Sequence, residues 1–478
     1  MLYYFPSSQV RLSSDLQTGL LGESLSPPST TTINRNKMLT WHSNFPAIIK
    51  TSRLTRIPKT STPVLAFSSS SHILQQSLRY AVLGAGFAGL SVAWHLLEHS
   101  PRGLHVCVDI LDEVGIGGGA SGVSGGLLHP YSPKVKPLWR AAECWEESLR
   151  LISIAESATR VKVPGLKNGG FDLNSNGFIA RRRGILRPTV NLKNMNAMTD
   201  NAQKCLASCR IKSINEDAAR TLVPDICVPS SSAFYMPDAV NINPQNYLEA
   251  LYVACETLAK DISGNGLGEK KINFHKRSID NLLELEGEYY AVIVCLGARS
   301  TFLPELSRRL PLRTCRGVVA HLHLPENIRE EFPDHSPSIL SDAWVAIQNP
   351  RNLYLGSTWE WKSCNYSQSV SMEEASKAME ELVPKASAVY PGIRKWAFDG
   401  ASAGLRAMPP LTGNGSLPIL GRIDDFISQP HESKFWIFSG LGSRGLLYHA
   451  WLGKLMAQAV ISCNEDVIPS ELTSWKST

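Results

Sequence analysis

Residues 79–100 read RYAVLGAGFAGLSVAWHLLEHS and contain the pattern that decides the fold. An apolar run from Tyr80 to Leu83 predicts a buried strand, because a short continuous apolar run suits a strand covered on both faces. From Leu90 to His99 the apolar residues recur at helical spacing, which predicts a helix. A glycine-rich turn joins the two, so the stretch predicts the first strand, turn and helix of an α/β unit.

The turn has the spacing GxGxxG, formed by Gly84, Gly86 and Gly89. The first glycine allows a tight turn, the second lets the backbone approach a pyrophosphate, and the third lets the helix pack closely on the strand. Phe87 and Ala88 stand at the helix start, where free N–H groups and the positive end of the helix dipole favour phosphate oxygens. These five residues are therefore candidate contacts of a dinucleotide.

A second apolar run, His105 to Leu111, predicts the next strand and is followed by Asp112. An acid at the end of this strand can accept hydrogen bonds from both hydroxyls of an adenosine ribose. Asp109 and Glu113 are alternatives for that role, and a solvated turn acid is a third. We favour Asp112 because it stands at the strand end, where the ribose is expected.

NAD and FAD both use such a unit, and the next segment favours FAD. Residues 115–130 read GIGGGASGVSGGLLHP, with seven glycines directly after the second strand. A nicotinamide-binding domain would normally continue with another strand and helix, whereas bare backbone can pass close to a bulky flat ligand and donate N–H groups to it. A flexible linker is the alternative, although the apolar Leu127 and Leu128 disfavour it. The candidate FAD contacts in this loop are Gly119, Ala120, Ser121 and Gly126.

The composition is ordinary for a globular protein: 478 residues, 43% hydrophobic and 19% charged. The net charge of +6 lies almost entirely in residues 1–78, which hold seven Lys and Arg against two Asp and Glu. The rest is close to neutral, so its charge gives no case for binding nucleic acid. With no apolar run of about 18 residues, we expect no membrane span. The ten cysteines contain no CxxC pair, so we expect reduced cysteines and no metal site.

Residues 1–78 are rich in Ser and Thr, poor in acidic residues and without helical or strand periodicity. Such a composition cannot bury a core and is typical of a transit peptide. We expect a disordered leader that directs the protein to the chloroplast, with the mitochondrion as the alternative. An extension without a targeting role is also consistent with the composition.

These motifs resemble those of the FAD-dependent amine and amino-acid oxidoreductases related to D-amino-acid oxidase, glycine oxidase and sarcosine oxidase. The resemblance is carried by GAGFAG at 84–89, by Asp112 and by GGGASG at 117–122. It implies FAD as cofactor, with the last motif wrapped around the diphosphate and the flavin. It also implies that the apolar strand in GEYYAVIVCLGARS (287–300) closes over the diphosphate side at Gly297. No Cys or His stands out as a covalent anchor, so we expect noncovalent FAD.

Four further segments narrow the resemblance to the FAD oxidase domain of the bifunctional bacterial tRNA 5-methylaminomethyl-2-thiouridine biosynthesis protein. They are LPLRTCRGVVAHL (310–322), NLYLGSTWEW (352–361), AGLRAMPPLTGNGSLPILG (403–421) and GLGSRGLLYHAWLGKLMAQAV (440–460), and GLGSRG is the most specific of them. The similarity runs from about residue 79 to residue 465. We expect no methyltransferase domain here, since the leader is too short to hold one. The near-neutral body gives no independent support for a tRNA substrate.

We therefore expect an α/β (α+β) fold in two domains. A Rossmann-like FAD-binding domain is assembled from residues 79–165, 241–309 and 400–470, and an antiparallel-sheet substrate domain from residues 166–240 and 310–399. Helical patterns predict helices over 133–160, across an excursion at 191–229 and after Asn243-Pro244. Alternating patterns predict antiparallel strands within 317–324, 341–348 and 352–361.

Arg406 stands as one positive charge in the largely small and apolar stretch AGLRAMPPLTG, residues 403–413. A guanidinium offers a permanent charge and a planar fork that match a carboxylate. The resemblance implies the same role, because glycine oxidase-like enzymes carry their carboxylate-clamping arginine at this place. A structural ion pair with Asp399 is the alternative.

Residues 440–455, GLGSRGLLYHAWLGKL, predict a loop followed by an amphipathic helix. The first N–H groups of such a helix favour the negative charge that a flavin acquires on reduction. Gly442, Ser443 and Gly445 are the candidate cofactor contacts, and Arg444 is a second candidate for the substrate. A plain helix start is the alternative. The weaker candidates for the pocket wall are Trp344, Tyr354 and Trp359.

The expected reaction is oxidation of the C–N bond of a carboxylate-bearing amine by hydride transfer to the flavin, followed by hydrolysis of the imine. The substrate is expected to be a small-molecule amine or amino acid, or the carboxymethylaminomethyl group of a tRNA wobble uridine. A free amino-acid oxidase or dehydrogenase for glycine, sarcosine or proline is the alternative. A flavin-binding assembly factor without turnover belongs to a different class and also remains open.

Overall fold

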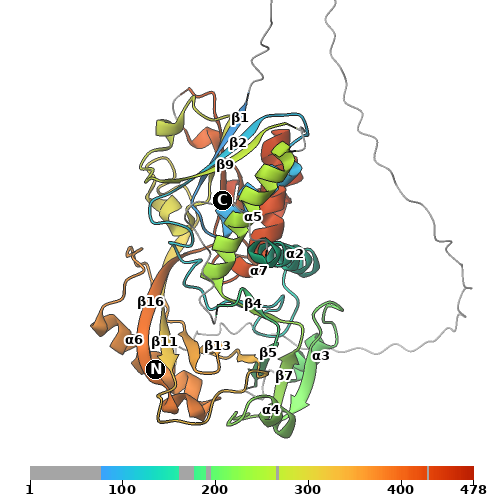
Figure 1. The fold of residues 1–478 in the computed structure, drawn as a ribbon, viewed down its shortest axis with the longest axis vertical. Coiled ribbons are helices and arrows are strands. Elements are labelled where there is room, and N and C mark those ends of the chain that lie inside the picture. Colours follow the sequence, from blue (N-terminus) through green and yellow to red (C-terminus); the bar gives the residue numbers. More distant parts are fainter. Residues whose placement is uncertain (1–76, 161–176, 190–194, 265–267, 428–429, 478) are drawn as a thin grey trace, which may run out of the picture. The chain divides into compact units, whose positions relative to one another are not determined.

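The computed structural model describes residues 77–160, 177–189, 195–264, 268–427 and 430–477 (Figure 1). These residues belong to one unit, His72–Thr478. Residues 1–76 of the expected leader lie outside the described residues, so the transit peptide stays a prediction. Among the helices of the described ranges, none is both long enough and apolar enough to cross a membrane.

The first sheet is built around the strand that the sequence placed before the glycine-rich turn. In the order of the sheet its strands are β19 (Ile419–Arg422), β20 (Lys434–Ser439), β10 (Ala291–Val294), β1 (Leu78–Leu83), β2 (Val106–Asp112) and β9 (Lys270–Lys276). All neighbours pair in parallel except β19 with β20. Tyr80 to Leu83 are fully buried, as expected for a central parallel strand.

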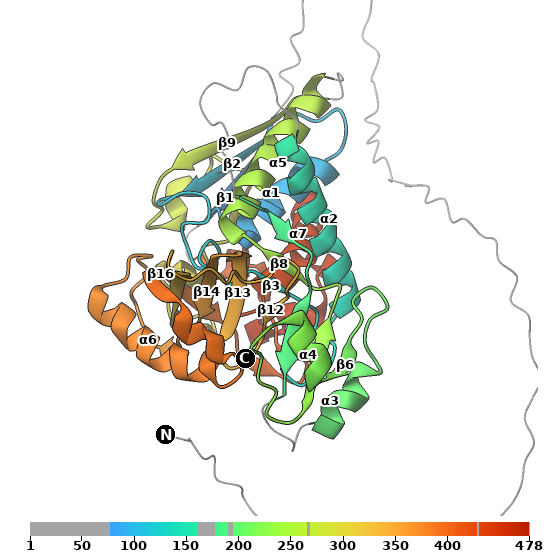
Figure 2. The same cartoon turned by 60° about the horizontal axis from the view of Figure 1, so that its bottom comes forward.

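Helices α1 (Phe87–His99), α5 (Pro244–Gly264) and α7 (Gly445–Ser462) cover one face of this sheet, and α2 (Ala141–Arg160) packs on α5 and α7 (Figures 1 and 2). They share one hydrophobic core with the strands. The Asn-Pro helix start is confirmed, because the side chain of Asn243 accepts a hydrogen bond of 3.1 Å from Asn246 N at the beginning of α5. The expected helix over 133–160 begins only at Ala141, since Pro133 and Pro137 interrupt helical geometry before it.

The second sheet is mainly antiparallel, as the alternating patterns predicted. Its main path runs through β15 (Glu360–Trp361), β11 (Arg313–His323), β14 (Asn352–Gly356), β13 (Trp344–Asn349), β12 (Ser338–Ile339), β5 (Ile185–Pro188), β7 (Ser232–Met236) and β6 (Lys212–Asn215), and β16 (Ala397–Met408) also pairs with β11. Helix α6 (Met372–Ser387) packs on it over a separate core. The mixed α/β fold class is thus confirmed, and β16 extends past residue 400, which the sequence had assigned to the FAD-binding domain.

The excursion at 191–229 differs from the purely helical prediction. Residues 191–194 lie outside the described residues; the rest contains α3 (Met195–Ala202), the strand β6 and α4 (Glu216–Leu222). Strand β6 pairs antiparallel with β7, so an available sheet edge overrides the weak helical pattern there. The remaining elements are β3 (Leu127–Leu128), β8 (Val240–Ile242) and β4 (Ala180–Arg181) in a small sheet, the hairpin β17 (Leu411–Thr412) and β18 (Gly415–Ser416), and the short helix α8 (Ser470–Thr473).

Candidate active site

A cavity of about 510 Å³ lies where the carboxyl ends of β1, β2, β10 and β20 face the second sheet. The carboxyl ends of parallel strands meet at one edge of a sheet, which is where α/β folds bind their ligands. Every cofactor and substrate residue that the sequence singled out lines this cavity except Gly89, and so do two of the three aromatic candidates. The cavity therefore brings together segments from residue 84 to residue 447 of the chain.

The three glycines of the GxGxxG turn are needed for close packing. A Cβ on Gly84, whose φ is 102°, would lie 2.6 Å from the carbonyl oxygen of Cys295. A Cβ on Gly89 would lie 1.8 Å from the carbonyl oxygen of Gly84, so Gly89 seats α1 against β1 and does not face the cavity. Helix α1 begins after Gly86 without a side-chain cap, which leaves its N-terminus to a ligand.

Asp112 stands at the end of β2 and lines the cavity. Its carboxylate accepts hydrogen bonds of 2.9 Å from the backbone N–H groups of Ala85, Val114 and Gly115, so its position is fixed. Of its two rivals, Asp109 is buried outside the cavity lining and engaged with Arg79 and Asn273. Glu113 does line the cavity but forms an ion pair with Arg299. Asp112 lines the cavity and forms no ion pair among the described residues, so the geometry favours it as the ribose acceptor.

The glycine-rich loop is anchored at both ends of its bend. Ser121 Oγ accepts a hydrogen bond of 3.1 Å from Phe87 N, and the amide of Gln368 donates to the carbonyl oxygens of Gly117 (2.9 Å) and Gly119 (3.0 Å). A Cβ on Gly126 would lie 1.8 Å from Ile242 O. This bare backbone lies along the cavity beside the start of α1, as a large flat ligand requires.

Two further glycine turns close the cavity. Gly297, with a φ of 56°, follows β10, and its carbonyl oxygen accepts a hydrogen bond of 3.0 Å from Ser439 Oγ at the end of β20. Gly442, with a φ of 55°, donates a hydrogen bond of 3.0 Å to Ala407 O of β16. The second bond fixes the loop before α7 next to the strand that carries Arg406.

Helix α7 begins at Gly445, and the residue that precedes it, Arg444, provides no side-chain cap. Ser443, Arg444 and Gly445 all line the cavity, so the uncapped N-terminus of the helix faces the site. This helix is long and buried, and His449 holds it in the core through a 2.8 Å hydrogen bond with the hydroxyl of Tyr247. The positive end of its dipole is thereby directed at the cavity.

Arg406 lies on β16 with its guanidinium 4.1 Å from the centroid of the Trp359 ring. It donates hydrogen bonds to neutral acceptors: Thr358 O at 2.9 Å, and Cys315 O and Ser357 Oγ at 3.3 Å. Burial lowers its pKa, and among the described residues no carboxylate lies within ion-pair distance of it. The alternative partner, Asp399, lies 3.9 Å from His323 instead.

The aromatic candidates divide between the cavity and the core. Trp344 and Trp359 line the cavity, and the Trp344 ring packs over Gly125 and Gly356. Tyr354 does not line it, because its ring stacks on His321 with the centroids 4.4 Å apart. Trp359 covers Arg406 and therefore belongs to the site.

Sequence reasoning missed several polar residues of the cavity, and Arg187 and His129 bear most on its charge. Arg187 lies on the four-residue strand β5, and His129 follows the glycine-rich loop. Burial lowers the pKa of Arg187 and lowers that of His129 well below its ordinary value. No local pattern marked either residue, because their place in the site depends on how two distant strands meet.

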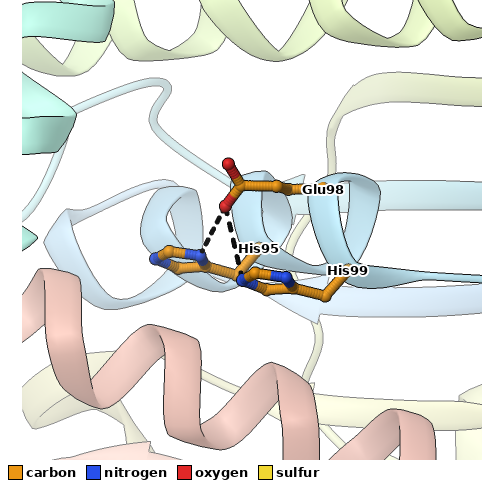
Figure 3. Close-up of side chains that lie close together, drawn as sticks. All are labelled: His95, Glu98 and His99. Atoms are coloured by element: carbon orange, nitrogen blue, oxygen red, sulfur yellow. Dashed lines mark ion pairs between the residues drawn. The ribbon is translucent and has the colours of Figure 1, made fainter. Parts of the chain in front are cut away.

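Three side chains on α1 lie close enough to share a metal ion: His95, Glu98 and His99, whose ligand atoms lie within 4.8 Å of one another (Figure 3). Glu98, however, accepts two hydrogen bonds of 2.8 Å from Arg150 of α2. Burial alone would raise the pKa of Glu98, but hydrogen bonds from His95 and Arg150 hold it below its usual range. His95 also contacts Ala450 O of α7 at 3.1 Å. We assign the cluster to an ion-pair network that joins three helices.

The fold and the site define a dinucleotide-binding oxidoreductase whose cofactor lies at the carboxyl edge of a parallel sheet. Comparison with protein families identifies it further: the model of the DAO family, FAD dependent oxidoreductase, matches residues 79–459, and the chain belongs to this family. Its cofactor is accordingly FAD. A protein of Rhizobium etli described as a thiamine biosynthesis oxidoreductase, ThiO, is 27% identical over 210 residues, 42% of this chain and 53% of that relative. The chain thus spans about half the length of the curated relative it matches.

Solved structures show the same fold at low identity. Glycine oxidase from Geobacillus kaustophilus superposes with a TM-score of 0.60 at 14% identity, over 81% of this chain and 95% of that one. Iminodiacetate oxidase from Chelativorans sp. BNC1 superposes with a TM-score of 0.57 at 17% identity, over 83% of this chain and 98% of that one. L-proline dehydrogenase from P. horikoshii has a TM-score of 0.60 at 13% identity, over 84% of this chain and 98% of that one. At such identities the likeness concerns the fold alone.

The cavity residues fit FAD on their own geometry. The glycines whose Cβ atoms would collide with neighbouring backbone form a cradle at one end, and Asp112 offers an acceptor for a ribose there. The uncapped N-termini of α1 and α7 supply N–H groups for anionic or electron-rich parts of the cofactor. Trp344 and Val319 add apolar wall for a flat ring system.

Proposed function

We propose that the protein oxidises the C–N bond of an amine that carries a carboxylate, either an amino acid or an N-substituted glycine, and that water hydrolyses the resulting imine. Noncovalently bound FAD supplies the acceptor for the hydride that leaves the carbon next to nitrogen. The observation that carries the proposal is Arg406, a half-buried cation in the cavity wall without a carboxylate partner among the described residues. The names of three structural neighbours, a glycine oxidase, an iminodiacetate oxidase and an L-proline dehydrogenase, support the same class of donor.

Arg406 acts as an anchor because its position is fixed from several sides. Thr358 O and the ring of Trp359 hold the guanidinium, and its charge is little screened since burial removes water. A carboxylate bound there orients the neighbouring carbon and nitrogen. Binding therefore supplies part of the entropy cost of aligning the substrate for reaction. The positive potential of the cavity arginines also disfavours an ammonium and so favours the neutral amine that the reaction requires.

The start of α7 has the complementary task. Its free N–H groups at Gly445 and Leu446 carry the positive end of the helix dipole into the cavity. Such fixed dipoles stabilise negative charge that develops beside them without reorganising. In this scheme the chain's residues bind, orient and stabilise charge, and no acid–base side chain takes part.

A tRNA-linked substrate is a second candidate, favoured by aromatic residues at the cavity mouth. Trp359, Trp361 and Tyr366 are exposed by 45%, 44% and 48%. Arg313 lies 4.9 Å from the ring centroid of Trp361, and Arg299 lies 4.9 Å from that of Tyr366. Exposed rings suit nucleobases by stacking, and Arg313 adds a cation without an ion pair among the described residues, whereas Arg299 is paired with Glu113. This arrangement supports an N-carboxymethyl group on a wobble uridine.

The arginine triplet 181–183 does not add to the case for RNA. Arg181 and Arg183 form ion pairs with Asp334, and Arg182 forms one with Glu156. Charges already neutralised by carboxylates contribute little to phosphate binding.

We further propose the chloroplast as location, with the mitochondrion as the alternative, on the composition of residues 1–78. Fusion of this segment to a fluorescent protein and imaging in plant cells tests it. Fluorescence spread through the cytosol would contradict the proposal.

Anaerobic flavin bleaching with a substrate panel tests the proposed function. The purified protein should be yellow, and glycine, sarcosine, proline or 5-carboxymethylaminomethyluridine should reduce its flavin absorbance. Bleaching by a free amino acid selects the small-molecule substrate, and bleaching only by the modified nucleoside or its tRNA selects the second candidate. A protein that binds FAD yet is bleached by none of them would support an assembly factor without turnover.

A further inference from the structure

The cavity contains a second group of positive charge besides Arg406. Arg187, on β5, and Arg444, before α7, both line it, and so does His129. The charge of Arg444 lowers the pKa of Arg187, so the two guanidiniums lie close enough to repel each other. Arg406 lies on β16, which pairs with β11, and β14, β13 and β12 separate β11 from β5 in the second sheet. The cationic wall therefore has two centres, one at Arg406 and one at Arg187 and Arg444.

The second centre has no ion-pair partner in the described part of the chain, where no hydrogen bond or ion pair joins the side chain of Arg187 or Arg444 to a carboxylate. The one acid that acts on Arg187 is Asp342, an exposed residue that lines the same cavity without pairing with it. Arg183, only four residues before Arg187, differs from it because Arg183 is exposed and forms an ion pair with Asp334. Two adjacent, largely desolvated cations are costly unless an anion joins them.

His129 adds a donor without adding charge. Burial, together with the charges of Arg444 and Arg187, keeps its pKa well below the ordinary value, so the ring is neutral. Its Nδ1 accepts a hydrogen bond of 3.3 Å from Tyr131 N, which leaves Nε2 to carry the proton. A neutral N–H beside two guanidiniums is an arrangement that suits an anionic oxygen.

We propose that Arg187, Arg444 and His129 form a second anion subsite, so that the substrate bears an anionic group on its nitrogen substituent in addition to the carboxylate held by Arg406. The inference rests on the proposed amine oxidation and deepens it. The substrate class is an N-carboxymethyl amine whose other arm ends in a carboxylate or a phosphate-like group. Guanidinium forks bind both kinds of anion, so the experiment has an arm for each.

Three probes that differ only in the second arm test the subsite on the holoenzyme: N-ethylglycine, iminodiacetate and N-(phosphonomethyl)glycine. Flavin bleaching gives kcat/KM, and perturbation of the flavin spectrum gives binding. Arg187→Gln should lower kcat/KM for the preferred dianionic probe about tenfold more than for N-ethylglycine, which loses only the cavity potential that Arg187 shares with the other arginines. Arg187→Lys should recover part of the loss. Arg183→Gln, the matched control on a paired surface arginine, should change none of them.

The outcomes separate this inference from the proposed function. Equal losses for all three probes, or no loss for any, overturn the subsite while oxidation of N-ethylglycine upholds the function. Binding of a dianion that depends on Arg187, without oxidation of any probe or of any member of the first panel, upholds the subsite and overturns the function. If no probe binds or reacts, both fail. Flavin content and melting temperature of each variant are measured first, so that misfolding is not mistaken for lost binding.

Discussion

The two ends of the cavity are built by different means. The end that holds the GxGxxG turn consists of backbone: Gly84, Gly86 and Gly126 make room, and helix α1 presents its N-terminus. The opposite end consists of side chains, with Arg406 and Trp359 from the second sheet. A backbone cradle tolerates no added atom, whereas a side-chain wall can change its residues and keep its shape. We therefore expect the first end to fix the cofactor and the second to set the substrate.

The largest effect is expected at the backbone end. In Gly89→Ala the new Cβ would lie 1.8 Å from Gly84 O, so α1 must move off β1. We expect a loss of about 3 kcal/mol or more in unfolding free energy, and loss of bound FAD. Gly413→Ala is the control, since its Cβ would meet no atom within 4 Å. Denaturant unfolding and the flavin-to-protein absorbance ratio measure both effects, and a Gly89→Ala protein with its full complement of FAD would disprove the packing argument.

At the side-chain end, Arg406→Ala should separate binding of substrate from binding of FAD. Loss of the guanidinium costs a carboxylate substrate its charged hydrogen bonds, about 2–4 kcal/mol, so kcat/KM should fall about 30- to 1000-fold. The FAD content should stay unchanged, because the neighbours of Arg406 are Trp359 and neutral oxygens.

Steady-state kinetics with the best substrate of the panel measure the effect of Arg406→Ala. Arg220→Ala, an exposed arginine paired with Glu216 on α4, is the control and should be neutral. Loss of FAD from Arg406→Ala would show that this residue binds the cofactor and not the substrate.

The contrast also explains what the sequence could predict. The backbone end depends on spacing within one segment, so Gly84, Gly89 and Asp112 were found from their positions alone. The side-chain end joins β5, β16 and the segment after β14, and no sequence period tells which strands become neighbours. Arg406 was found because its charge contrasts with an apolar segment and because the family resemblance placed it. Arg187 lies close to the arginine triplet 181–183, so its charge does not stand out from its sequence neighbours as that of Arg406 does.

The pH dependence of stability tests whether a neutral, buried His449 holds helix α7 in the core. Burial lowers the pKa of His449 on α7 to about 4, against an ordinary value of 6.5. Between those values the unfolded chain binds a proton that the folded one does not, so stability is present above about pH 6.5 and is lost as the pH falls toward 4. The full effect is on the order of 3 kcal/mol.

His449→Gln removes that proton linkage while its amide can still bond to Tyr247. Urea unfolding of both proteins at pH 7 and pH 5 should show a smaller loss of stability in the variant. Identical losses in the two proteins would mean that His449 is not held neutral in the fold.

The smallest effect is expected where one side chain assists the backbone end. Asp112→Asn keeps an acceptor for Ala85 N, but it removes the charge that strengthens hydrogen bonds from a ribose and turns an amide NH2 toward Val114 N and Gly115 N. We expect FAD to bind about tenfold more weakly, measured by flavin fluorescence during titration of the apoprotein. Glu113→Gln is the matched comparison, since Glu113 lines the same cavity but is neutralised by Arg299. A larger loss of FAD affinity in Glu113→Gln than in Asp112→Asn would show that Glu113 binds the ribose. The choice of Asp112 from its position at the strand end would then be wrong for this chain.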